Sequence, residues 1–198
     1  MEVFNQYRRL SVLLLFVLMC IQGFSLWGIV SRGNADFVSN IVETTAFWFA
    51  YTILEQIKGI RINLYIRMAA ILAIIGDSFF GLYLNLYVTS QTFDRIQHIF
   101  GAYALALLLY ALTLQFDKQG AQDGFKRFLF VVALGVSAGA VYEIMEYLSD
   151  SLLHPQIPNQ PSLRDTDLDL VSDLVGALLA GIHAVMQGSL FQTKQRDW

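Results

Sequence analysis

Six long apolar segments constrain the fold of this 198-residue chain more than any other feature of its sequence. Each is close to the roughly 17–25 residues that an α-helix needs to cross a bilayer. The apolar residues run continuously, without the alternation that marks the strands of a transmembrane β-barrel. The sequence therefore predicts an all-α, polytopic membrane protein, a bundle of six transmembrane helices at about residues 10–30, 37–57, 64–88, 96–116, 128–148 and 168–186.

The composition agrees with this fold class. Hydrophobic residues make up 56% of the chain and charged residues only 15%, which is too apolar for an ordinary soluble domain. Little chain remains outside the six segments, so we expect a single integral membrane domain over residues 1–198. The only cysteine, Cys20, has no partner for a disulfide within the chain.

The basic residues predict the orientation in the membrane. Three of the thirteen, Arg32, Arg95 and Arg164, fall on one side of the predicted helices. The other ten fall on the opposite side: Arg8, Arg9, Lys58, Arg61, Arg67, Lys118, Lys126, Arg127, Lys194 and Arg196. Because short cytoplasmic loops are rich in Lys and Arg, this bias predicts that both termini lie in the cytoplasm.

Acidic residues recur at helical spacing in the outer halves of three predicted helices. An ionised carboxylate at the bilayer centre costs roughly 2.5–3.5 kcal/mol on insertion scales. Such residues must therefore be compensated, which predicts a buried acidic site that opens outward. The three sets are Asp94 with His98, then Glu143, Glu146 and Asp150, then Asp165, Asp169 and Asp173.

Residues four apart share one face of a helix, so each set can point toward a common site. We predict five metal ligands, namely His98, Glu143, Glu146, Asp169 and Asp173, of which His98, Glu143 and Asp173 are also the catalytic candidates. Asp94, Asp165, Arg95 and Arg164 are placed at the rim of the site. Asp94 could instead be a helix N-cap, and Asp165 a partner of the helix dipole. The role of Asp77, which lies deeper in its helix, stays open.

Small residues predict how two of these helices meet. Gly135 and Gly139 continue the acidic stripe of segment 128–148, and Gly176 and Gly181 lie along segment 168–186. Small side chains allow neighbouring helices to approach closely, which would bring the carboxylates of the two segments together. Between them, the loop 149–164 contains all three prolines and is either a lid over the site or an ordinary solvent loop.

The donor set suits certain cofactors and excludes others. Carboxylates with one imidazole and no thiolate match Mg, Mn, Ca, Fe or Zn, although shared protons could equally compensate the carboxylates. We find no HExxH, EF-hand, GxSxG, Walker or dinucleotide motif, so no organic cofactor is expected. The basic residues form no continuous stripe, so nucleic acid is not an expected partner.

Three stretches carry a resemblance to known families: GDSFFGLYLNLYVTSQTFDRIQHIFGAY, VYEIMEYLSD and RDTDLDLVSDLVGALLAG. Together they resemble the YjdF-like bacterial inner-membrane proteins and, more distantly, the VanZ-like membrane proteins. The resemblance spans about residues 76–181. It includes Asp77, where the YjdF-like pattern has a histidine, and Gly176, together with the acidic and histidine residues above. It implies a membrane protein with this site and no particular reaction.

Three functions are compatible with the sequence. The first is a metal-assisted membrane enzyme that acts on a lipid-linked or envelope substrate, with deep carboxylates and a histidine as ligands and base. The second is a proton- or cation-coupled transporter that uses the acids as a relay. The third is a non-catalytic scaffold, whose polar network fixes the packing of the helices in the bilayer. The oligomeric state is not predicted.

Overall fold

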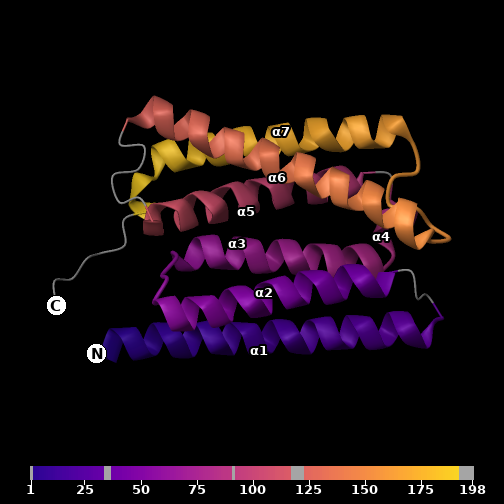
Figure 1. Ribbon diagram of the computed structural model, residues 1–198, viewed down its shortest axis with the longest axis horizontal. Coiled ribbons are helices and arrows are strands. Elements are labelled where there is room, and N and C mark those ends of the chain that lie inside the picture. Colours follow the sequence, from indigo (N-terminus) through magenta and orange to yellow (C-terminus); the bar gives the residue numbers. More distant parts are fainter. Residues whose placement is uncertain (1, 34–36, 91, 117–122, 192–198) are drawn as a thin grey trace. The chain divides into compact units, whose positions relative to one another are not determined.

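A computed structural model of the chain describes residues 2–33, 37–90, 92–116 and 123–191, and these residues are helical with short connections and no strand (Figure 1). Lys118, Lys194 and Arg196, which contribute to the predicted charge bias, lie outside the described residues. The chain divides into two compact units. One comprises Met1–Arg61 and Ile74–Thr89, and the other Ile62–Ala73 and Ser90–Trp198. That both units make one membrane domain stays a prediction.

Five of the described helical stretches are long and apolar enough to cross a membrane. They are Gln6–Ser31, Leu64–Tyr83, Phe93–Phe116, Gly124–Leu153 and Leu163–Met186. The all-helical membrane class is therefore confirmed. The sixth predicted span, residues 37–57, corresponds to α2 (Val38–Lys58), which is not among the five. Its polar residues, including Asn40, Glu43 and Glu55, interrupt its apolar sequence.

In the first unit, α1 (Glu2–Ser31) lies antiparallel to α2 (Figure 1). The start of α1 contacts the end of α2, where Tyr7 donates a hydrogen bond to Glu55 Oε1 at 2.8 Å. Ser11 donates to the other oxygen of this buried carboxylate. At the opposite end of α1, Arg32 donates to the carbonyl of Tyr83 at 2.8 Å. Polar contacts therefore fix both ends of α1 within this unit.

The predicted helix 64–88 is wrong at its C-terminal end. The α-helix α3 (Leu64–Ile75) continues as the π-helix η2 (Gly76–Tyr83), and a separate turn, α4 (Leu86–Thr89), follows. The wide π turn closes with the Leu84 N–H on the carbonyl of Phe79 at 2.9 Å. Asn85 then has φ 62°, in the left-handed region that asparagine tolerates better than most residues, and the helix ends there.

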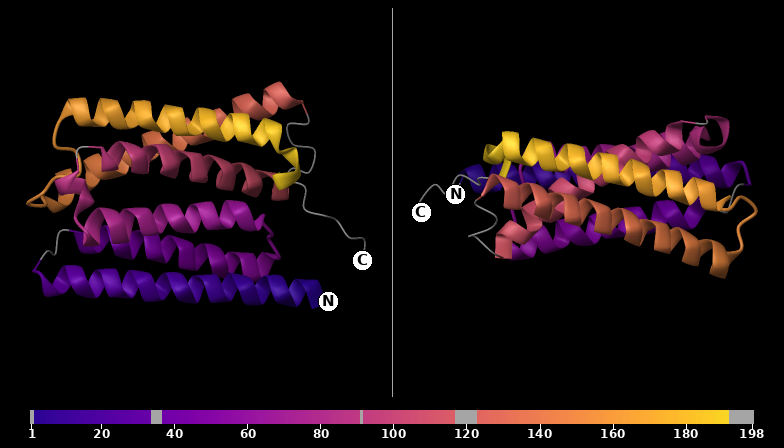
Figure 2. Two further views of the ribbon diagram at one scale, coloured as in Figure 1. Left: turned by 180° about the vertical axis from the view of Figure 1, so that it is seen from behind. Right: turned by 90° about the horizontal axis from the view of Figure 1, so that it is seen from above.

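In the second unit, α5 (Phe93–Phe116), α6 (Gly124–Leu153) and α7 (Leu163–Met186) pack against one another in all three pairs (Figure 2). A short 3-10 turn, η3 (Gly188–Phe191), follows α7. The predicted contact at the glycines is confirmed. A β-carbon at Gly135 would lie 2.6 Å from Cβ of Ala177, and one at Gly176 would collide with the carbonyl oxygen of Ile99. Only glycine therefore fits at these crossings.

The connection between α6 and α7 is shorter than predicted. The helix α6 continues to Leu153, and α7 begins at Leu163 after the N-cap Ser162, whose Oγ accepts from the Asp165 N–H at 3.2 Å. Residues 154–162 thus form the loop in place of 149–164. The starts of α5 and α7 lie at the end of the unit where α6 finishes, and the candidate site forms there (Figure 1).

Candidate metal centre

His98 lies at the centre of the acidic cluster, between two pairs of carboxylates. It is in the second turn of α5 and is 8% exposed. Its Nδ1 atom lies 3.1 Å from Asp173 Oδ1 of α7 and 3.8 Å from Glu143 Oε1 of α6. The three helices of the second unit each contribute one of these side chains. We call His98, Glu143 and Asp173 the inner group.

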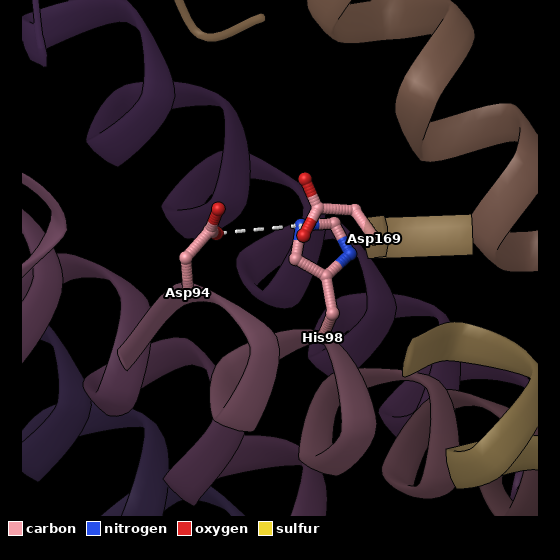
Figure 3. Close-up of side chains that lie close together, drawn as sticks. All are labelled: Asp94, His98 and Asp169. Carbon is pink, nitrogen blue, oxygen red and sulfur yellow. Dashed lines mark ion pairs between the residues drawn. The ribbon is translucent and has the colours of Figure 1, made fainter. Parts of the chain in front are cut away.

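The other ring nitrogen faces a second pair. Nε2 of His98 lies 3.5 Å from Asp94 Oδ1 and 4.0 Å from Asp169 Oδ1 (Figure 3). We call Asp94, His98 and Asp169 the outer group. In each group the three potential ligand atoms lie within 4.8 Å of one another, close enough to bind a single metal ion. Because both groups contain His98, its imidazole connects them.

Three buried carboxylates of the cluster have an oxygen atom with no hydrogen-bond donor among the described residues. These atoms are Oε1 of Glu143, Oδ1 of Asp169 and Oδ2 of Asp173, in residues that are only 5%, 3% and 4% exposed. A buried polar atom that lacks a partner costs about 1–3 kcal/mol, and more when it is charged. Each of these oxygen atoms can therefore accept a further hydrogen bond or bind a cation.

Arg95 supplies positive charge to the outer group only. Its guanidinium lies 3.0 Å from Asp94 Oδ2, forms an ion pair with Asp165, and has Nε 3.7 Å from Asp169 Oδ1. The outer carboxylates are thus partly neutralised by protein. Asp94 follows the first residue of α5 and contacts Arg95 and His98, so it is not the N-cap of that helix. Asp165 contacts Arg95 at the rim, as predicted for its position.

Other residues singled out in the sequence are members of neither group. Glu146 is half-buried and has no hydrogen-bond or ion-pair partner in the described part of the chain, and it belongs to neither group. Arg164 is exposed at the start of α7. Asp77 belongs to the first unit, where Tyr87 donates to its Oδ1 at 2.8 Å. Sequence spacing predicted His98, Glu143, Asp169 and Asp173 as neighbours, and the structure brings these four together, whereas Glu146 as a metal ligand stays a prediction.

Sequence reasoning did not identify Gln160 as part of the site. From the loop 154–162, its Nε2 donates to Glu143 Oε2 at 2.8 Å and to the carbonyl of Glu143 at 2.9 Å. Tyr142 was also missed, and its ring packs edge-on against the imidazole of His98, with centroids 5.8 Å apart. Gln160 carries no pattern in the sequence, since a loop side chain has no periodicity, and Tyr142 of α6 is one of many aromatic residues in the apolar segments.

The close packing of α6 and α7 positions the inner group. A β-carbon at Gly139 would collide with the carboxylate of Asp173, so glycine at this position makes room for that carboxylate. Gly139 is one turn before Glu143 on the same helix face, and the same crossing therefore brings Glu143 toward His98.

These features define a helical membrane protein with a buried acidic and histidine cluster. The chain belongs to the family of predicted membrane proteins DUF2238, whose model matches residues 11–189. It is similar to an uncharacterized protein of Thermotoga maritima (strain ATCC 43589 / DSM 3109 / JCM 10099 / NBRC 100826 / MSB8), with 29% identity over 149 residues, or 70% of this chain and 74% of that protein. No solved structure matches the chain.

Proposed function

We propose that this membrane protein binds one divalent metal ion at His98, Glu143 and Asp173. The observation that carries the proposal is that ligand atoms of these three buried residues lie within 4.8 Å of one another, with Glu143 Oε1 lacking a donor of its own. Two carboxylates and one imidazole suit Mg, Mn, Ca, Fe or Zn. The predicted fourth and fifth ligands, Asp169 and Glu146, are not needed for this set.

The inner group is favoured over the outer group because of charge. Arg95 already lies against Asp94 and Asp169, and a second cation beside its guanidinium would be repelled. No Lys or Arg of the described residues forms an ion pair with Glu143 or Asp173. With Nδ1 of His98 on the metal, its Nε2–H would face Asp94, the carboxylate–histidine arrangement common around protein-bound metals.

A metal held in this way supports the function of an enzyme acting on a lipid-linked or envelope substrate at the outer leaflet. A bound divalent ion can polarise a phosphoryl or carbonyl oxygen and activate a water molecule. Glu143, Asp173 and His98 would together hold the ion. Arg164, exposed in the first turn of α7, has the charge to attract an anionic substrate group, and a small anionic molecule is an alternative substrate.

Close packing argues against the alternative of a cation-coupled transporter. On the inner side of the cluster, Gly176 packs on the Ile99 carbonyl, and Gly135 packs on Ala177 and Ala106. This close backbone packing at Gly135 and Gly176 disfavours a water-filled route between the three helices. A scaffold function is favoured by a different observation, namely the ion pairs of Arg95 with three carboxylates, which suit a purely structural network.

The family match supports the YjdF-like resemblance, whereas the VanZ-like resemblance stays a prediction. We infer that the protein resides in a bacterial inner membrane with six spans, α2 included, and cytoplasmic termini. At about 1.5 Å per residue, the 21 residues of α2 rise about 31 Å, enough to cross the hydrocarbon core. The hydroxyls of Thr44 and Thr52 bond to carbonyls of their own helix at 2.9 Å, which reduces their cost in lipid.

Single-cysteine labelling tests this topology. In a Cys20→Ser background, a membrane-impermeant reagent added to intact cells should label Ser151→Cys, and it should reach Arg9→Cys and Lys58→Cys only after the cells are opened. Labelling of Arg9→Cys and Lys58→Cys from opposite sides would show that α2 does not cross. Protection of Ser151→Cys in intact cells would overturn the outward-facing site.

Metal binding to the detergent-purified protein tests the function. We expect one Mn²⁺ or Zn²⁺ per chain by elemental analysis after dialysis, lost in Glu143→Gln and retained in Glu55→Gln. If the wild type stays metal-free at saturating Mn²⁺ and Zn²⁺ while Glu143→Gln folds normally, the scaffold function replaces the enzyme.

A further inference from the structure

We propose that Gln160 is a positioning residue for Glu143, and this role rests on the metal site proposed above. The carboxylate of Glu143 has two oxygens with different surroundings. Oε2 accepts the hydrogen bond from Gln160 Nε2 at 2.8 Å, and Oε1 faces His98 Nδ1 at 3.8 Å without a donor of its own. The hydrogen bond to Oε2 thus fixes the rotation of the carboxylate that turns Oε1 to the inner group.

The carboxamide of Gln160 is held in place by a second contact on the same helix. Besides Oε2, its Nε2 donates to the main-chain carbonyl of Glu143 at 2.9 Å. A donor that bridges the backbone and the side chain of one residue restricts the side chain to a single orientation. Since Gln160 is neutral, it orders the carboxylate without bringing a positive charge that would compete with a metal ion.

Asp150 fastens the loop that carries Gln160. Its Oδ1 accepts from the backbone N–H of Asn159 at 2.9 Å and from the Asn159 side chain at 2.7 Å. Its Oδ2 accepts from the backbone N–H of Gln160 at 2.8 Å. Asp150 lies about two turns after Glu143 on α6, so the helix that provides the ligand also fixes the loop.

The prolines of the loop restrict its backbone conformation. Pro155, Pro158 and Pro161 each fix φ and restrict the residue before them, which lowers the entropy lost when the loop is fastened to Asp150. One continuous series of hydrogen bonds therefore runs from the carboxylate of Asp150, through the backbone and side-chain amide of Gln160, to Glu143 Oε2. The series ends at the inner group, where Glu143 Oε1 lies 3.8 Å from His98 Nδ1.

Hydrogen bonds that orient metal ligands typically contribute about 10–100-fold to metal affinity. The test uses the full-length protein in detergent and measures Mn²⁺ affinity from the electron paramagnetic resonance signal of the free ion. Gln160→Met keeps the side-chain length and the backbone N–H on Asp150 but removes the donor, and should bind Mn²⁺ about 10–100-fold more weakly. Asn159→Ala is the matched control, because it removes a side-chain contact to Asp150 but keeps both hydrogen bonds from Gln160 to Glu143, and it should retain nearly wild-type affinity.

A double-mutant cycle separates positioning from a general effect on the fold. In a Glu143→Asp background, which keeps a carboxylate ligand but shortens it away from the Gln160 amide, Gln160→Met should cause no further loss of Mn²⁺ affinity, because the two residues act through one contact. An equal loss in both backgrounds would overturn the positioning role, as would wild-type affinity in Gln160→Met. A wild type that binds no Mn²⁺ at all would overturn the metal site itself, and that result is visible before any variant is compared.

Discussion

Two buried glutamates, one in each unit, have opposite surroundings. Glu55 of the first unit is 2% exposed and accepts hydrogen bonds from Tyr7 at 2.8 Å, from Ser11, and from Tyr51 at 3.3 Å. Glu143 of the second unit is 5% exposed, and its side chain has a single donor, Gln160, on one oxygen. Both are carboxylates removed from water, yet only Glu55 has donors on both oxygens.

The difference shows how burial alone fails to identify a functional acid. Hydroxyl donors satisfy a buried carboxylate and make it part of the packing, as Tyr7 and Ser11 do for Glu55. Glu143 lies instead near Asp173 and His98, with oxygen atoms left for a cation. A buried carboxylate that lacks donors and has other potential ligands as neighbours is therefore the better indicator of a binding site.

The largest effect on metal affinity is expected at one of the histidines of the second unit. His98→Ala removes the imidazole from the inner group and should weaken Mn²⁺ binding by about 100-fold or more, since second-sphere changes alone cost 10–100-fold. His183, which is bonded to Tyr103 elsewhere in the unit, is the matched control. Calorimetric titration should find His183→Ala unchanged in affinity. Comparable losses in both variants would contradict the assignment of His98 as a metal ligand.

An intermediate effect is expected where α6 and α7 cross. Gly139→Leu would collide with Asp173 and should lower the free energy of unfolding by about 1–3 kcal/mol, while also weakening metal binding. Ala133→Leu, at an exposed position of the same helix, adds similar bulk and should be tolerated. Thermal melting of both purified variants measures the contrast. Equal melting temperatures would contradict the close crossing that assembles the inner group.

The smallest effect is expected on the stability of the metal-free protein, where the two glutamates can be compared directly. Glu55→Gln loses one of two acceptor oxygens facing hydroxyl donors and should cost about 1–2 kcal/mol of stability. Glu143→Gln removes a charge near Asp173 and should leave metal-free stability unchanged or slightly raised. Chemical denaturation in a chelator measures both. A larger loss in Glu143→Gln than in Glu55→Gln would reverse the assignment of the structural and the binding carboxylate.

Much of this fold was predictable because membrane spans depend on local composition. The apolar windows located the spanning helices, and the glycines of α6 predicted its contact with α7. The end of the helix predicted at 88 was missed because a π turn preserves apolar composition while changing the hydrogen bonds of the backbone. Sequence composition alone does not detect that change.

The candidate site was predictable only in part. Spacing of four placed Asp169 and Asp173 on one face, and the structure brings both to His98. Glu146 is three residues after Glu143, which turns it about 60° away from the same direction around the helix at about 3.6 residues per turn. The sequence could not predict the role of Gln160, because its position depends on how the loop folds back against α6.

Anomalous diffraction from crystals of the wild-type protein grown with Mn²⁺ tests the central claim most directly. The metal site predicts one strong peak per chain, within ligand distance of His98 Nδ1, Glu143 Oε1 and a carboxylate oxygen of Asp173, and no such peak beside Glu55. Absence of a peak at the inner group from well-ordered crystals at saturating Mn²⁺, with the three side chains in the same arrangement, would contradict the metal site.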